Sequence, residues 1–271
     1  MCSEQVPSGI DPAKAHPARR YNYWLGGKDN FAADRASANV VASGFPTVRL
    51  AAVENRRFLR RVVTYLVEEA GIDQFIDIGT GLPSAGNVHE IAQAVVPESR
   101  IVYVDNDPIV LVHARALLTS APQGATAYLE ADLREPDKIT SHPDLLRTLD
   151  MSRPMALMLV ATMHFITDEH QPYEIIEHLR GILPSGSYVV MTHATNDHLT
   201  TEELVEAEAA NQRSGVPFRL RSQQEFARFF TGLQLLSPGI TSVVEWRPDT
   251  PPEQRPAISD VSMLCGVARV P

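Results

Sequence analysis

The chain has 271 residues, 44% of them hydrophobic and 21% charged, which is the composition of a globular protein with one large domain or two small ones. Its formal charge of −9 disfavours non-specific binding to nucleic acid or to an anionic membrane surface. Cys2 and Cys265 are too few for a disulfide framework, and no apolar run approaches the ~20 residues that span a bilayer. Because the N-terminal stretch MCSEQVPSGIDP also lacks a signal-peptide pattern, we expect a cytoplasmic protein.

The chain changes character near residue 48. Residues 1–18 are rich in Pro and Ala, and we expect them to be loosely ordered. The stretch RRYNYWLGGKDNFAADR (19–35) combines aromatic and charged residues with a Gly-Gly pair and matches no helix or strand pattern. In residues 48–70, apolar pairs recur every four residues, which predicts an amphipathic helix that ends at Gly71.

From residue 74 onward, short apolar runs alternate with helical patterns. The expected strands are 74–79, 100–105, 126–132, 154–161 and 187–194, and the expected helices are 84–94, 107–118, 168–183 and 201–212. Such alternation predicts a parallel sheet with helices on both faces. After a helix with a Ser222–Glu225 capping box, the segments 233–238 and 261–270 both read as strands. Because no helix separates them, they predict an antiparallel pair at the sheet edge.

Polar residues stand where the first three expected strands end. Gly79-Thr80-Gly81 follows the first strand, and glycines at that turn let the backbone approach a ligand closely. Asp105 closes the second strand, where a carboxylate can accept hydrogen bonds from both ribose hydroxyls, and Asp132 closes the third, where a side chain can meet the base. Aspartate is also a common turn residue, so each acid alone is weak evidence. Together they predict a nucleotide-like cofactor beyond the carboxyl ends of the strands.

Two features favour S-adenosylmethionine over a dinucleotide. The dinucleotide fingerprint has Gly or Ala at its sixth position, where this chain has Ser84. Asp77, inside the first strand, puts a negative charge close to the place of a pyrophosphate. That charge suits the cationic amino group and sulfonium of S-adenosylmethionine. An NAD-dependent oxidoreductase is therefore the weaker alternative.

Four segments resemble the bacterial S-adenosyl methyltransferase family once catalogued as a domain of unknown function: DIGTGLPSAGNVHEIAQ, RIVYVDNDPIVLVHARALL, EADLREP and YNYWLGGKDNFAADR. The resemblance runs from about residue 11 to the end of the chain. It implies an α/β, Rossmann-like class I methyltransferase fold, with a seven-stranded, mostly parallel sheet, an antiparallel last strand and helices on both faces. It also implies an N-terminal arm and helical cap over the cofactor site in residues 1–47, followed by a methyltransferase domain in residues 48–271.

By this resemblance, the 19–35 stretch lies over the cofactor. Tyr21 and Tyr23 have the same parity, so an extended segment would turn both rings to one side, where aromatic rings can pack against a sulfonium. Gly26 and Gly27 would let the segment turn. The alternative is that the aromatic residues only anchor a terminal arm to the core.

Other candidate residues also have two interpretations. Arg56 either pairs with the cofactor carboxylate or lies, with Arg57, Arg60 and Arg61, on a solvated helix face, which is the default for such a charge run. Asn87 either caps its helix or contacts the cofactor. Asn106 neighbours the same pocket. The residues that we assign to cofactor binding are Tyr21, Tyr23, Gly27, Arg56, Gly79, Thr80, Gly81, Asn87, Asp105, Asn106, Asp132 and Leu133.

Two histidines follow the fourth and fifth expected strands, at the predicted catalytic crevice. Histidine there can take a proton from a hydroxyl nucleophile, which makes His164 the candidate catalytic residue. The alternative, which we favour for both His164 and His193, is a hydrogen-bonded pocket wall. No HExxH motif or Cys-His ligand spacing indicates a metal site.

The predicted function is methyl transfer from S-adenosylmethionine to a small molecule, with S-adenosylhomocysteine as the product. The segment DEHQPYEIIEHLRGILPSGSYVVMTHA (168–194) resembles the corresponding region of small-molecule O-methyltransferases, which favours oxygen as the acceptor atom. A non-catalytic protein that senses S-adenosylmethionine is the alternative. We expect neither nucleic acid nor membrane as a partner.

Overall fold

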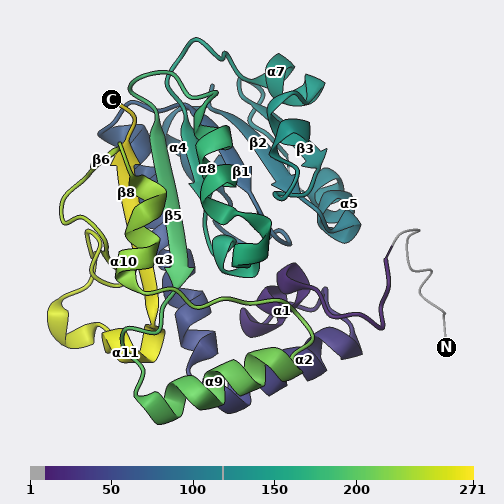
Figure 1. Ribbon diagram of the computed structural model, residues 1–271. Helices are drawn as coiled ribbons and strands as arrows, with labels where there is room; N and C mark the ends of the chain where they lie inside the picture. The colour runs from purple at the N-terminus through teal and green to yellow at the C-terminus, as the bar shows by residue number, and fades with distance from the viewer. Residues whose placement is uncertain (1–9, 118) are drawn as a thin grey trace.

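The computed structural model describes residues 10–117 and 119–271, and its centre is a mixed β-sheet (Figure 1). The strands are β1 (Gln74–Ile78), β2 (Arg100–Asp105), β3 (Ala125–Glu130), β4 (Ala156–Leu159), β5 (Tyr188–Ala194), β6 (Gln234–Leu235), β7 (Thr241–Ser242) and β8 (Met263–Arg269). Their order is β3-β2-β1-β4-β5-β8-β6, with β7 pairing β8 beside this path. Strands β1 to β5 are parallel, whereas β8 is antiparallel to β5, β6 and β7. The predicted parallel sheet with an antiparallel last strand is confirmed, and β7 is an addition to it.

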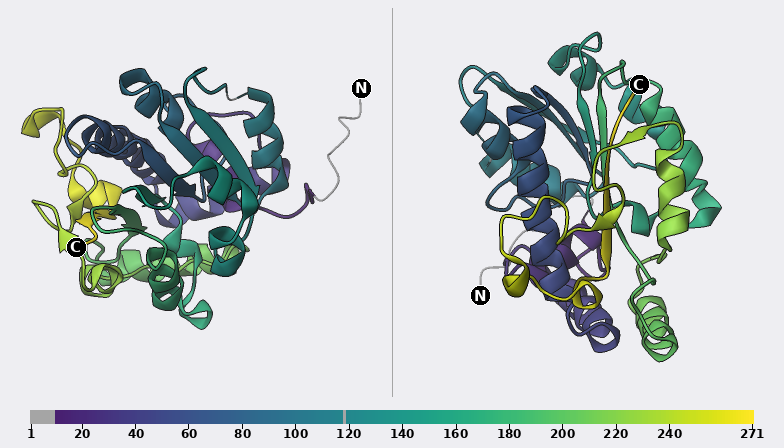
Figure 2. Two further views of the ribbon diagram at one scale, coloured as in Figure 1. Left: turned by 90° about the horizontal axis from the view of Figure 1, so that it is seen from above. Right: turned by 90° about the vertical axis from the view of Figure 1, so that its left-hand side faces the viewer.

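Helices cover both faces of this sheet (Figure 2). On one face, α3 (Val48–Glu68) and α4 (Val88–Val95) share an apolar cluster with Phe75 of β1. On the other face, the cluster joins Ile76 of β1 to α6 (Pro136–Thr140), α7 (Pro143–Thr148), α8 (Pro172–Arg180) and α10 (Gln223–Ala227). Neighbouring residues of a strand point to opposite faces, which is why Phe75 and Ile76 belong to different clusters.

The remaining helices are shorter or lie at the edges of the sheet. α5 (Pro108–Leu117) contacts β2 and β3, and α11 (Ile258–Val261) contacts α3. The 3-10 helices are η1 (Met163–Phe165), η2 (Asp168–His170), η3 (Arg228–Phe230) and η4 (Pro252–Gln254). Within residues 10–117 and 119–271, no helix has both the length and the apolar character that a membrane crossing requires.

A third group of helices lies across the carboxyl ends of the parallel strands (Figure 1). It consists of α1 (Pro17–Trp24), α2 (Ala32–Gly44) and α9 (Thr201–Arg213), and α2 packs along α9. The sequence pattern predicts α9 but neither α1 nor α2. Residues two apart in a helix point about 200° away from each other, so the predicted common orientation of Tyr21 and Tyr23 is wrong.

Local signals set where several of these helices begin. In α1, Nδ1 of His16 accepts a hydrogen bond from the amide of Ala18, and Pro17 takes the first helical position. The predicted capping box of α10 is confirmed, since the carboxylate of Glu225 accepts from the Ser222 amide at 2.8 Å and Ser222 Oγ accepts from the Glu225 amide at 3.2 Å.

The turn between α1 and α2 is built around Asn22. Its Oδ1 accepts hydrogen bonds from the amide of Asp29 at 3.1 Å and from Nδ2 of Asn30 at 2.8 Å. The amide of Gly27 donates to the Asn22 carbonyl oxygen, and a Cβ on Gly27 would lie 2.3 Å from Nδ2 of Asn22. Glycine at position 27 therefore serves the packing of this turn.

Gly44 sets how closely α2 and α9 approach each other. A Cβ on Gly44 would lie 2.7 Å from the carbonyl oxygen of Glu206 and 2.7 Å from Cβ of Ala210. We expect Gly44→Val to lower the free energy of unfolding by about 1–3 kcal/mol, because the helices must separate to admit the side chain. The matched control is Ala36→Val on the exposed side of α2. Urea unfolding of both variants is the measurement, and equal stability of the two would contradict this packing constraint.

Candidate active site

The main cavity lies between α1 and the carboxyl ends of the strands and has a volume of about 480 Å³. Most of the sequence-predicted cofactor residues line it. They are Tyr21, Arg56, Gly79, Thr80, Gly81, Asp105, Asn106, Asp132 and Leu133. Residues of the N-terminal arm, among them Lys14 and His16, complete the wall. The structure thus brings together residues from α1, α3 and the ends of three strands at one place.

The glycine loop after β1 forms the floor of this main cavity. Gly79 and Gly81 have φ angles of +72° and +68°, which residues with a side chain rarely adopt. A Cβ on Gly79 would also lie 2.5 Å from Oγ1 of Thr162. Position 84, where a dinucleotide loop has its third glycine, is a serine whose amide donates to Oδ1 of Asn87 at 3.3 Å. The side chain of Asn87 therefore holds the loop at the position where a dinucleotide-binding loop has a glycine that allows close backbone packing.

Two buried carboxylates, Asp77 and Asp105, face the main cavity. Oδ2 of Asp105 accepts from the Gly81 amide at 2.8 Å and its Oδ1 from the Asp107 amide at 2.9 Å, while Asp77 accepts from Oγ1 of Thr80 at 3.1 Å. Burial raises the pKa of Asp77 to about 6 and that of Asp105 to about 6. Within the described part of the chain, no cationic side chain lies within 4.0 Å of either carboxylate. A ligand with hydroxyl donors or positive charge suits both.

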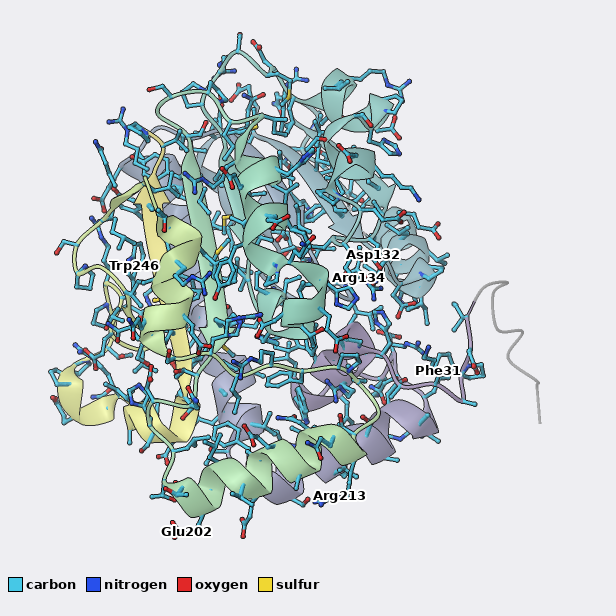
Figure 3. All side chains as sticks on the ribbon, in the orientation of Figure 1. Phe31, Asp132, Arg134, Glu202, Arg213 and Trp246 are labelled. Carbon is cyan, nitrogen blue, oxygen red and sulfur yellow. The ribbon has the colours of Figure 1, made fainter. Side chains whose placement is uncertain are left out.

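Asp132 and Arg134 lie together at the rim of the main cavity, on the side that faces α1 (Figure 3). Asp132 accepts hydrogen bonds from Nδ2 of Asn106 at 3.0 Å and from the Arg134 amide at 2.9 Å, and it pairs with the Arg134 guanidinium. Burial disfavours the charge of Asp132, but the bonds from Arg134 outweigh it and hold the pKa of the carboxyl below its usual range. Arg134 lies within the EADLREP segment but was not among the residues predicted to bind the cofactor.

Three predicted cofactor residues lie outside the lining of the main cavity. The hydroxyl of Tyr23 donates to Oδ1 of Asn39 at 3.3 Å, and the Arg49 guanidinium stands 4.9 Å from its ring centre. Gly27 packs in the turn after α1, as described above. Asn87 begins α4, where its amide donates to the Glu90 carboxylate at 3.0 Å, in line with the capping alternative.

The arginines of α3 have separate environments. Nη2 of Arg56 donates to the carbonyl oxygens of Ala85 and Gly86, at 3.2 and 2.9 Å, and so ties α3 to the loop beside the main cavity. Arg57 pairs with Glu54 of the same helix. The predicted solvated face is wrong for Arg61, whose guanidinium donates to the carbonyl oxygens of Trp246 and Val243 in the C-terminal loop.

Buried polar contacts fix α1 over the main cavity. Nε of Arg19 donates to the Asp107 carboxylate at 2.9 Å, and its Nη1 lies 3.7 Å from the buried Asp34. The hydroxyl of Tyr21 donates to the Ala52 carbonyl oxygen at 3.0 Å and accepts from Nδ2 of Asn55 at 3.0 Å. Arg19 and Tyr21 therefore join α1 to the residues that follow β2 and to α3, respectively.

A second cavity, of about 90 Å³, adjoins the first beneath α1, α2 and α9. Tyr21, Ala161 and Phe165 line both cavities. Ala161 follows β4 with φ +58°, a strained conformation for a residue with a side chain. Such strain is common at functional sites. No sequence pattern marks the backbone conformation of Ala161.

The candidate base His164 lines the second cavity and not the main one. Burial, together with the neighbouring His193 and Arg20, lowers the pKa of His164 well below its usual range, so the imidazole is neutral near pH 7. Its Nδ1 is buried without a hydrogen-bond partner among the described residues. His193, in contrast, is held by the Ala194 carbonyl oxygen at 2.7 Å and by Nη1 of Arg221 at 2.9 Å, as the wall alternative predicts.

Comparisons with known proteins agree with this architecture. A family model described as S-adenosyl methyltransferase matches residues 3–271. A DUF574 family protein from Streptomyces avermitilis is 43% identical, with 96% of this chain and 99% of that chain covered and a TM-score of 0.92. A putative methyltransferase from Thermobifida fusca is 39% identical, with 99% of each chain covered and a TM-score of 0.88. A search among curated proteins found no match.

More distant structures share the fold. An O-methyltransferase family protein from Burkholderia thailandensis is 16% identical, with a TM-score of 0.56 over 95% of this chain and 64% of that chain. The fold is that of a class I methyltransferase, and S-adenosylmethionine is the cofactor. The chain belongs to the S-adenosyl methyltransferase family and is an S-adenosylmethionine-dependent methyltransferase.

Proposed function

We propose that the main cavity holds S-adenosylmethionine and that the enzyme methylates a hydroxyl oxygen of a small molecule bound in the second cavity. The observation that carries the proposal is the junction of the cavities at Tyr21, Ala161 and Phe165. The donor and acceptor sites would meet there, beside α1, whose Tyr21 lines both cavities.

The residues of the main cavity fit the parts of the cofactor. Asp105 has unused lone pairs for the ribose hydroxyls, since each oxygen accepts one backbone N–H. Asn106 and Asp132 would lie beside the base, with Leu133 as an apolar wall. Asp77 would face the amino group and Arg56 the carboxylate of the methionine part. Bound S-adenosylmethionine supplies a methyl group on a cationic sulfur that leaves as S-adenosylhomocysteine.

The protein's own task is to align the acceptor and to exclude water. The hydrogen bonds of the Tyr21 hydroxyl leave its ring as a fixed wall between the two cavities. A hydroxyl acceptor must lose its proton when the new bond forms, and Nδ1 of the neutral His164 is free to take it. The small size of the second cavity and the likeness of residues 168–194 to O-methyltransferases support a small hydroxyl-bearing acceptor.

The direct test is turnover with candidate small molecules, followed by mass spectrometry of the products. We expect S-adenosylhomocysteine to appear together with a methyl ether. His164→Ala should lower turnover by about a hundredfold while the affinity for S-adenosylmethionine stays the same, because only proton removal is lost. The control is His178→Ala, on the exposed side of α8. Methylation at nitrogen or carbon alone would refute the oxygen assignment.

A second test uses the carboxylates of the main cavity. Protonation of Asp105 and Asp77, whose pKa values are about 6, removes the negative charge that holds the hydroxyls and the cationic group. The affinity for S-adenosylmethionine should therefore rise as the pH increases through about 6 and level off above it.

The variant Asp105→Asn should bind S-adenosylmethionine at least about tenfold more weakly at pH 7.5, with a flatter pH profile, since it loses charged hydrogen bonds. Calorimetry across pH 5 to 8 is the measurement, with the exposed Glu98→Gln as control. Unchanged affinity in Asp105→Asn would remove the ribose assignment.

A further inference from the structure

The two cavities differ in the charged side chains that line them. The main cavity has both signs in its wall, with the carboxylates of Asp77, Asp105 and Asp132 and the cations of Lys14, Arg56 and Arg134. The described lining of the second cavity contains no aspartate or glutamate, and its charged side chain is Arg20. The mixed charges of the main cavity suit a cofactor that carries both signs, whereas the second cavity offers only a cation to its ligand. A negatively charged acceptor is therefore favoured there.

Arg20 is a buried cation with little to neutralise it. Its side chain is almost fully buried, with 1% exposed, and Nη1 donates only to the hydroxyls of Ser37 at 3.3 Å and Ser214 at 3.1 Å. Nε of Arg20 has no partner, and in the described part of the chain no carboxylate lies within 4.0 Å of the guanidinium. Burial lowers the pKa of Arg20 to about 10, against the opposite effect of the charge of Asp34, so the side chain stays charged near pH 7. A buried charge without a contacting counter-ion is costly, which indicates a missing anionic partner.

Two further polar atoms in the wall of the second cavity lack partners. Nε1 of Trp24 is buried without an acceptor, and the Arg20 guanidinium stands 5.6 Å from the Trp24 ring centre. Nδ1 of His164 is likewise unpartnered. Buried N–H groups without acceptors are rare in native proteins, so Nε of Arg20 and Nε1 of Trp24 point to a ligand oxygen. Nδ1 of His164 keeps its lone pair for the proton of the acceptor hydroxyl.

We propose that the second cavity binds a small hydroxy-substituted aromatic acid, with its carboxylate on Nε of Arg20 and Nε1 of Trp24 and its hydroxyl toward His164. This inference rests on the proposed function and names the substrate class of that site. The ring would lie among the aromatic side chains of Phe45, Phe165 and Phe218. Because the volume of the cavity is about 90 Å³, the acceptor has about one ring and extends toward the cofactor at Tyr21.

Arg20 also joins α1 to α2 and to the loop after α9, so a purely structural role is the competing explanation. That role requires the Nη1 bonds to the serine hydroxyls. It leaves Nε of Arg20 and Nε1 of Trp24 unused, and it predicts no preference of the protein for an acid over its amide. Ligand charge therefore separates the two explanations without any substitution.

The experiment uses the full chain saturated with S-adenosylhomocysteine and titrated by calorimetry with 2-, 3- and 4-hydroxybenzoate and the three matching hydroxybenzamides. We expect at least one acid to bind, and to bind about tenfold or more tightly than its amide, because only the acid pairs with the buried cation. If none of the acids binds, or if acid and amide bind equally, the inference is overturned.

Two variants locate the effect. Arg20→Gln should weaken binding of the acid by about thirtyfold and leave that of the amide nearly unchanged, whereas Trp24→Phe, which keeps the aromatic packing, should weaken both by a few-fold. The matched control is Arg60→Gln, an exposed arginine of α3. An acid affinity that Arg20→Gln leaves unchanged would overturn the assignment of the anchor. If Arg20→Gln does not fold, Trp24→Phe and the comparison of acid with amide decide.

The affinity for S-adenosylhomocysteine, measured first in every variant, separates two kinds of failure. Loss of the acid preference with intact S-adenosylhomocysteine binding refutes only the acceptor class. Absence of S-adenosylhomocysteine binding in the unsubstituted chain would refute the assignment of the main cavity itself.

Discussion

The buried ion pair between Arg19 and Asp107 holds the first helix across the ends of the strands. Asp107 follows Asp105 by two residues, and its amide donates to the Asp105 carboxylate at 2.9 Å. The position of α1 is thus tied through a short length of backbone to the acid that we assign to the ribose. Removing one partner of such a buried pair typically costs about 3–5 kcal/mol, because the other charge is left uncompensated. Both cavities exist because α1 stays in this place, since Tyr21 is in the wall of each.

The division of charge between the cavities gives the site its chemical logic. Carboxylates and cations together line the place of the cofactor, whereas Arg20 is the charged residue in the described wall where the acceptor would bind. Opposite charges then lie on the two reactants as well, which favours their approach at the junction. The net charge of −9 is a sum over the whole chain, so it does not indicate that Arg20 is buried at the second cavity.

The sequence was sufficient to predict the sheet and the main cavity. Buried strands with glycine or aspartate at their ends are local features, and parallel pairing alone brings Gly79, Asp105 and Asp132 to one edge. The helices α1 and α2 escaped prediction because their buried residues include Arg19, Arg20 and Asp34, so no apolar periodicity marks them.

The second cavity was beyond the reach of sequence patterns for a different reason. Its wall comes from α1, the loop after β4, the end of β5 and the segment after α9, which are far apart in the chain. In the sequence, nothing distinguishes Arg20 from a surface arginine, because only tertiary packing buries it. In RRYNYWLGGKDNFAADR, the first arginine bonds to Asp107, the second faces the second cavity, Tyr21 separates the two cavities, and Asn22 organises the turn.

The central claim is that α1 covers the bound cofactor, and amide hydrogen exchange of the full chain tests it most directly. Exchange is compared with and without saturating S-adenosylmethionine. The account predicts slower exchange in residues 20–31 on binding, because the ligand adds contacts to a helix that polar links hold in place, and little change in the sheet. Bound cofactor with unchanged exchange in residues 20–31 would contradict it.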